Sequence, residues 1–180
     1  LALRESLLAQ LEKAPLNKIT VTRVCEMADV NRSTFYLYYK DVYDLMEKIE
    51  NELYEDLMQL IGDSHTVLPG PDLLRRIYEV IYINRDLARV VFGKFGDKEF
   101  MKKISNVYRD RALDDWKKVL GATDEATLDY LYTFITYTNI GVVERWILTD
   151  FQETPEQLAR LTNRLLSYGA SAFLSKQSRS

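Results

Sequence analysis

Cysteine and histidine are almost absent from this chain of 180 residues, which contains one of each. The single cysteine, Cys25, excludes an internal disulfide bond and favours a cytoplasmic protein. The single histidine, His65, cannot build a metal cluster by itself, and we expect neither a metal nor another cofactor. No nucleophile–base pair and no glycine-rich phosphate loop is recognisable either. We therefore expect that the protein is not an enzyme.

Glycine and proline are also scarce, with 7 and 4 residues. So few chain breakers favour helices over many short strands. The longest apolar stretch, residues 128–148, contains Asp129, Glu144 and Arg145, which argues against a membrane-spanning helix. The remaining composition, 47% hydrophobic and 28% charged, is ordinary for a globular protein. We expect an all-α fold of about nine helices.

The most informative stretch runs from Ile19 to Tyr43. It has the pattern of two short helices joined by a tight turn and followed by the start of a third helix. Thr20 and Asn31 are suitable N-caps for the first two helices, because their side-chain oxygens can accept from free backbone N–H groups. Phe35 is expected to face the core. The stretch therefore predicts a helix-turn-helix.

The second of these helices, residues 32–39, presents cationic, hydroxyl and phenol groups on its outward rows. Such groups suit phosphate oxygens and the base edges of a major groove. Residues 18–40 carry four cations and two carboxylates, a modest excess in a chain whose net charge is −3, so we expect weak non-specific binding. The predicted DNA contacts are Thr22, Arg23, Arg32, Ser33, Thr34, Tyr36, Leu37, Tyr38 and Lys40.

These residues resemble the TetR/AcrR family of transcriptional regulators, whose pattern runs roughly G-V-S-x-x-T-[FL]-Y-x-[YH]-F-x-x-K-x-x-L. Residues 29–45 of this chain read DVNRSTFYLYYKDVYDL, and the T-F-Y-x-Y part is the most specific match. Asp29 stands where the family usually has glycine, and it should still tolerate a left-handed backbone. Val42 replaces a lysine that commonly holds a phosphate, a role that we expect Lys40 to take over in part.

The resemblance implies a helix-turn-helix DNA-binding domain over residues 1–45 and an effector-binding and dimerisation domain over residues 46–180. It implies a homodimer that binds a palindromic operator in double-stranded DNA and is released by a small-molecule effector. We expect a repressor. Because the chain does not begin with Met, we also expect its N-terminus to be processed or omitted, which leaves room for a missing basic arm.

Helical periodicity and breaks predict the other elements. Residues 62–71 form the clearest break in the chain. The helix over 123–149 is apolar on nearly all sides, so we expect it to be buried on both flanks. Thr154 to Gln157 has the pattern of a capping box at the start of the last helix. The further helices are predicted over residues 3–14, 41–61, 72–83, 85–92, 98–120 and 155–174.

Aromatic side chains are frequent in the middle helices and could line an apolar ligand pocket with a few polar orienting groups. The alternative is that they form ordinary core, which aromatic residues at helical spacing usually do. The predicted ligand-binding residues are Tyr78, Tyr82, Phe92, Phe95, Phe100, Asn106, Tyr108, Trp116, Tyr132, Thr136, Tyr137 and Asn139.

The last two helices carry more apolar surface than one small domain needs, which indicates an interface between two copies of the chain. The resemblance implies a four-helix bundle there. The alternative is that these residues close the core of the monomer. The predicted interface residues are Val142, Val143, Trp146, Leu165, Leu166, Gly169 and Phe173.

A different function is also compatible with the motif. Val42, Asp29 and the modest local charge would suit a TetR-like coactivator or adaptor that acts through a protein partner and does not read DNA itself. Failure to enrich any DNA sequence would favour that alternative.

Overall fold

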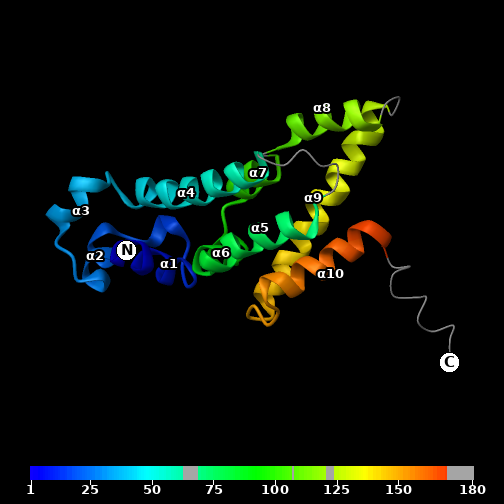
Figure 1. The fold of residues 1–180 in the computed structure, drawn as a ribbon. Helices are drawn as coiled ribbons and strands as arrows, with labels where there is room; N and C mark the ends of the chain where they lie inside the picture. The colour runs from blue at the N-terminus through cyan, green and yellow to red at the C-terminus, as the bar shows by residue number, and fades with distance from the viewer. Residues whose placement is uncertain (63–68, 107, 121–123, 170–180) are drawn as a thin grey trace. The chain divides into compact units, whose positions relative to one another are not determined.

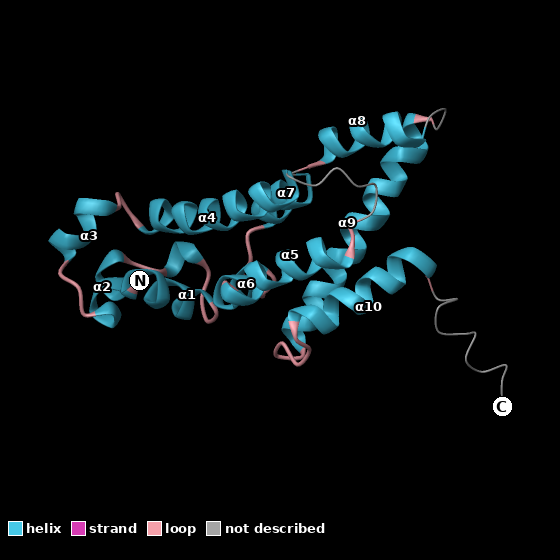
Figure 2. Cartoon of the chain, in the orientation of Figure 1, coloured by secondary structure: helices cyan, strands magenta, loops and turns pink. Residues whose placement is uncertain are grey.

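The computed structural model describes residues 1–62, 69–106, 108–120 and 124–169. Within these ranges the chain forms ten α-helices, one short 3-10 helix and no strand (Figures 1 and 2). The prediction of an all-α fold is therefore confirmed. No helix in this part of the chain combines the length and the apolar character that a membrane span requires.

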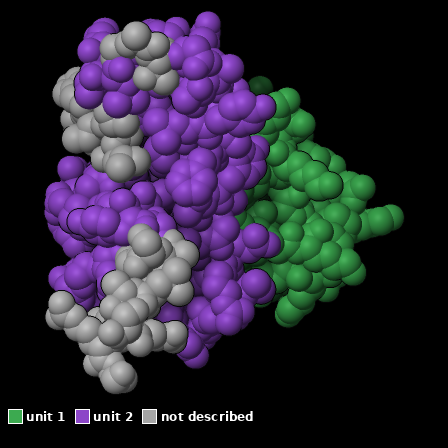
Figure 3. All heavy atoms as spheres, turned by 90° about the vertical axis from the view of Figure 1, so that its right-hand side faces the viewer, with its two compact units in different colours: residues 1–56, 84–104 green, residues 57–83, 105–180 purple. Residues whose placement is uncertain are grey.

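The chain divides into two compact units, which Figure 3 colours separately. Unit 1 contains Leu1–Asp56 and Asn84–Ile104, and unit 2 contains Leu57–Ile83 and Ser105–Ser180. The helix α4 (Val42–Gly62) starts in unit 1 and ends in unit 2.

Unit 1 is built around α1 (Ala2–Leu11), which packs on α2 (Val21–Ala28) and on α6 (Arg85–Val91). A 3-10 helix, Leu16–Lys18, precedes α2, and α3 (Arg32–Tyr38) packs on α2. Cys25 is 2% exposed, and burial raises the pKa of its thiol, so this cysteine behaves as a small apolar core residue. The buried core of this part includes Leu7, Leu8, Leu11, Val24, Cys25, Phe35, Leu45 and Ile49.

Glu50, on α4, is a partly buried carboxylate whose Oε1 atom is buried without a hydrogen-bond partner. Burial raises its pKa to about 7, with a further contribution from the charge of Asp97 and partial opposition from Lys103. The folded protein therefore keeps a proton on Glu50 that the unfolded chain releases near the ordinary value of 4.5. The resulting stabilisation is complete below that value and is lost as the pH rises toward 7.

We expect Glu50→Gln to remove this pH dependence, because the amide cannot ionise. At pH 8 the variant should gain roughly 1–2 kcal/mol of unfolding free energy, a figure reduced for solvent screening of a partly exposed group. Urea unfolding at pH 5 and at pH 8 measures the effect, and Glu55→Gln, an exposed position on the same helix, is the matched control. Equal pH dependence in Glu50→Gln and the wild type would contradict this assignment.

Unit 2 contains α5 (Pro71–Ile83), α8 (Arg109–Leu120), α9 (Glu125–Leu148) and α10 (Pro155–Tyr168). The helix α10 packs on α5 and α9, and α8 packs on α9. The predicted capping box is present, since the Thr154 hydroxyl accepts from the Gln157 backbone N–H and the Gln157 side chain accepts from the Thr154 N–H. These two bonds satisfy backbone donors that the first turn of α10 would otherwise leave open.

The described ranges contain one helix more than expected, because residues 98–120, predicted as one helix, hold two. The first, α7 (Lys98–Asn106), ends before α8 begins at Arg109. The last predicted helix, 155–174, is described only as far as Tyr168, with Gly169 as its C-cap. Its remaining residues, His65 and most of the predicted break at 62–71 lie outside the described residues.

The prediction that α9 is buried on both flanks is wrong for the single chain. Tyr130, Phe134 and Tyr137 are 77%, 56% and 61% exposed. One flank of α9 packs on α8 and α10, and the opposite flank is left open.

Candidate nucleic-acid interface

The helix-turn-helix predicted from residues 19–43 is present in unit 1. The Thr20 hydroxyl caps α2 by accepting from the Arg23 backbone N–H at 3.3 Å. The Asn31 side chain caps α3 by accepting from the Ser33 backbone N–H at 2.9 Å. Between the two helices Asp29 has φ 52° and ψ 43°, the left-handed conformation expected for the residue that replaces glycine. Local sequence therefore determines this corner almost completely.

One aromatic residue fixes the orientation of α3. Phe35 is fully buried, and its ring contacts those of Tyr36 and Tyr39 at centroid distances of 5.6 and 5.4 Å. Because Phe35 anchors one side of this short helix, the other sides must face outward. All nine residues predicted to contact DNA are exposed, including Tyr36 at 51%, Leu37 at 77% and Tyr38 at 65%. Exposure is a condition that DNA contact requires, and the contacts themselves stay a prediction.

A lysine that the sequence reasoning missed holds the end of α3 to α4. The Lys48 ammonium donates to the Tyr38 carbonyl at 2.7 Å and to the Asp44 carboxylate at 3.2 Å, and it lies 4.9 Å from the centroid of the Tyr39 ring. The Asp44 carboxylate also accepts from the Lys40 backbone N–H, and this bond, assisted by Lys48, lowers the pKa of Asp44. The spacing of four residues between Asp44 and Lys48 was the available signal.

Val42 lies in the core, where it is 5% exposed. The position at which the TetR/AcrR pattern carries a phosphate-binding lysine therefore offers no side chain to solvent in this protein. Lys40 is exposed two residues earlier, just before the Asp41 carboxylate that caps α4. The cation that we expect to replace the missing lysine is thus accessible.

Comparison with known proteins identifies the family. A TetR family model described as "Transcriptional regulator C-terminal region" matches residues 71–168, more than half of the chain. The protein belongs to the TetR family of transcriptional regulators. This is a family of regulators and not of enzymes.

One curated relative is the uncharacterized HTH-type transcriptional regulator YxbF of Bacillus subtilis (strain 168), which is 32% identical over 170 residues. The match covers 91% of this chain and 43% of YxbF, so the chain spans less than half the length of that relative. The region matched includes the helix-turn-helix as well as most of unit 2.

Two solved structures share the fold of this TetR family chain. The fatty acid degradation regulator FadR from Bacillus halodurans has a TM-score of 0.66 at 17% identity, with 93% of this chain and 94% of that chain covered. FadR from Bacillus subtilis, solved in complex with stearoyl-CoA, has a TM-score of 0.65 at 17% identity, with 93% and 97% covered. At this identity the likeness establishes the arrangement of helices and nothing about ligands.

The residues predicted to bind a ligand are divided between the two compact units of this TetR family member. Phe92, Phe95 and Phe100 belong to unit 1, whereas the other nine belong to unit 2. Asn106 and Tyr137 are exposed, and Tyr82 is 40% exposed. Ligand binding by these residues stays a prediction, and the structure favours other roles for several of them.

Three predicted ligand residues pack in one core cluster, in which Trp116 and Tyr132 are buried and Tyr108 is partly buried. The Trp116 and Tyr132 rings lie 6.1 Å apart, and the Tyr132 hydroxyl donates to the Ser105 carbonyl at 3.0 Å. The partly buried Thr136 lies one turn further along α9.

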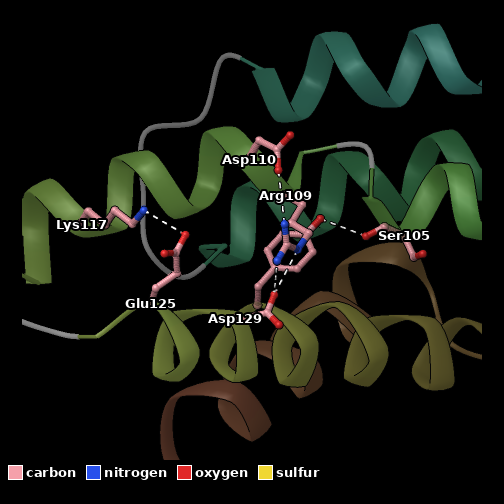
Figure 4. Close-up of polar contacts among 7 residues, drawn as sticks. Ser105, Arg109, Asp110, Lys117, Glu125 and Asp129 are labelled. Atoms are coloured by element: carbon pink, nitrogen blue, oxygen red, sulfur yellow. Dashed lines mark hydrogen bonds and ion pairs between the residues drawn. The ribbon is translucent and has the colours of Figure 1, made fainter.

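Charged contacts hold α8 on α9 around this cluster (Figure 4). The Arg109 guanidinium donates to the Asp129 carboxylate through Nε at 3.0 Å and also through Nη2. Lys117 lies 3.4 Å from a carboxylate oxygen of Glu125. These charged side chains are thus already used to join two helices.

A second set of polar groups joins α5, α9 and α10. The Tyr78 hydroxyl donates to Asn139 Oδ1 at 2.9 Å and lies 3.1 Å from the Thr162 hydroxyl. Burial raises the pKa of Tyr78 to about 12, so this phenol stays a neutral hydrogen-bond donor. Asn139 Nδ2 donates in turn to the Ile135 carbonyl at 2.8 Å. Tyr78 and Asn139 therefore stabilise the packing of three helices.

The predicted dimer-interface residues also differ in position. Val143 and Trp146 are 4% and 1% exposed, so they belong to the core of the subunit and offer no surface to a partner. Val142, Leu165 and Leu166 are partly buried, and Gly169 is exposed. Phe173 lies outside the described residues.

The open flank of α9 exposes an apolar surface that the predicted interface residues do not include. Its side chains recur at intervals of three, four or seven residues, the spacing of one helix face. Gly141 adds no side chain there, and a Cβ atom at this position would meet no atom within 4 Å. We call this surface the α9 stripe; it contains Tyr130, Phe134, Tyr137, Gly141 and Leu148.

Proposed function

We propose that the protein binds a palindromic DNA operator as a homodimer and represses transcription until a small-molecule effector releases it. The exposed face of α3, anchored by the buried Phe35, is the observation that carries this proposal. Each subunit places α3 in a major groove, with the two half-sites about one helical turn, roughly 34 Å, apart. Arg32 and Ser33, with Thr22 and Leu37, read bases, and the other predicted residues mainly hold phosphates.

The effector is proposed to bind in unit 2 and to act through α4, because that helix runs from unit 1 into unit 2. FadR from Bacillus subtilis, which shares the fold, is solved in complex with stearoyl-CoA. A long-chain acyl-CoA is therefore the first effector to test. Such a molecule can switch the protein only if it binds the DNA-free state more tightly than the DNA-bound state. If the operator affinity is the same with and without each effector that is tested, this part of the proposal is contradicted.

Selection from a random pool of double-stranded DNA tests the central claim. We expect the wild type to enrich a palindrome and Tyr36→Ala to enrich none, because Tyr36 lies on the exposed face of α3. Tyr43→Ala, which removes a tyrosine of similar exposure (52%) from α4 and outside the predicted DNA contacts, controls for a general effect of losing a phenol. If neither the wild type nor the control enriches a sequence, the adaptor function through a protein partner becomes the better account.

Arg32→Ala is expected to relax the sequence preference of the protein. Arg32 is exposed at the first position of α3, and a bidentate contact from a guanidinium to one base pair contributes about 1–3 kcal/mol of discrimination. Binding to a panel of single-base operator variants measures this effect. Tyr36→Phe, which removes one phosphate-directed hydroxyl, should instead weaken binding to all variants alike. A change of base preference in Tyr36→Phe would contradict our division between base and phosphate contacts.

A further inference from the structure

A hollow in unit 1 lies between the end of α1, the 3-10 helix and one side of α2. Three cationic side chains line it, Lys13, Lys18 and Arg23, and all three are exposed. None of the described residues that line the hollow is a carboxylate. The hollow is therefore a local concentration of positive charge in a chain whose net charge is −3.

The three cations differ from several others in this protein in having no counter-charge among the described residues. Arg109, for example, pairs with Asp129, and Arg75 pairs with Glu79. For Lys13, Lys18 and Arg23, in contrast, no carboxylate of the described chain lies within ion-pair distance. Three like charges close together repel one another, and a bound anion would remove that cost.

The rest of the lining is apolar or an amide. Ile19 is 7% exposed and Met27 is 55% exposed, and the side-chain amide of Gln10, itself 7% exposed, also contributes to the lining. Gln10 is held in place by a bond from its Nε2 atom to the Ser6 hydroxyl, which donates in turn to the Val24 carbonyl. Cations at the rim and apolar groups beside them suit a ligand with an anionic group and an apolar face.

We infer that this hollow binds a sugar–phosphate unit of a DNA strand. The inference rests on the proposed function, which it extends to residues of α1 and the 3-10 helix. Phosphate oxygens would meet the three cations, and the carbon face of a deoxyribose would lie against Ile19 and Met27. Arg23, which lines the hollow, is itself one of the predicted DNA contacts, so the rim of the hollow belongs in part to the surface assigned to DNA. The positive end of the α2 dipole favours the same anion.

We expect these contacts to raise the affinity for DNA of any sequence and to leave the sequence preference unchanged. Each phosphate that a cation neutralises contributes about 0.9 to the slope of log affinity against log salt concentration. We expect the double variant Lys13→Gln/Lys18→Gln to reduce that slope by about 1 to 2. At low salt it should bind operator and unrelated DNA roughly 10-fold more weakly, with the selected palindrome unchanged.

The test is fluorescence anisotropy of labelled operator over a range of salt concentrations. Lys98→Gln, an exposed lysine of unit 1 outside the hollow, is the matched control and should keep the wild-type slope. Thermal unfolding verifies that each variant is folded. Calorimetric titration with inorganic phosphate, on the wild type and the double variant, separates a DNA phosphate from a free phosphate as the ligand.

A salt slope reduced in the double variant alone would support the inference. If the double variant keeps the wild-type salt slope and DNA affinity, the inference is wrong. It is also wrong if the double variant loses binding of inorganic phosphate but still binds DNA as the wild type does. If the wild type binds no DNA at all, the proposed function fails first and the inference fails with it.

Discussion

Phe134→Asp is expected to make the protein a monomer at micromolar concentration. The residue lies at the centre of the α9 stripe and is 56% exposed in the single chain. If two copies pair through this surface, the aspartate is buried without a partner, which costs about 3–5 kcal/mol in each subunit. The dimer would weaken by at least a hundredfold, and operator binding would fall with it, since both half-sites must be occupied together.

Sedimentation velocity measures the mass of the wild type and of the variant. Val119→Asp is the matched control, because Val119 is 64% exposed and apolar but lies near the end of α8. We expect the control to remain dimeric. A wild type that sediments as a monomer would contradict the proposed dimer, and a dimeric Phe134→Asp would show that the α9 stripe is not its interface.

The helix-turn-helix was predictable because short-range rules determine it. The caps at Thr20 and Asn31, the left-handed Asp29 and the buried Phe35 each depend on residues a few positions away. The family pattern adds to the same local information. Lys48 was missed only because its partners, the Tyr38 carbonyl and Asp44, had not been considered together.

The second unit was less predictable because periodicity shows which residues share a helix face but not what that face meets. Tyr78 and Tyr132 were assigned to a pocket, yet each uses its hydroxyl to join helices that are distant in sequence. Tyr137 was assigned to the same pocket and is exposed. An aromatic side chain can be core, pocket or interface with the same sequence spacing, and only packing against remote helices decides between them.

Trp146 shows this difference most clearly. It was predicted at the dimer interface, but it is 1% exposed and its ring contacts three aromatic rings of its own unit. The centroid distances are 4.8 Å to Phe151, 5.9 Å to Tyr78 and 6.0 Å to Tyr82. Its indole N–H donates to the Glu153 carbonyl at 2.9 Å, which holds the turn before α10 in place.

Trp146→Ala is therefore expected to lower the unfolding free energy by about 3–5 kcal/mol, through lost apolar burial and the cavity that remains. Trp146→Phe keeps most of the ring packing but leaves the Glu153 carbonyl without its donor, so it should cost less than Trp146→Ala, about 1–3 kcal/mol in total. Urea unfolding measures both variants, at several protein concentrations. Substitution of a core residue lowers the unfolding free energy by the same amount at every protein concentration at which the chain is a monomer. Substitution of an interface residue lowers it only at concentrations at which dimers form. If the variants lose stability only at concentrations at which the protein is a dimer, Trp146 belongs to the interface and the core assignment is wrong.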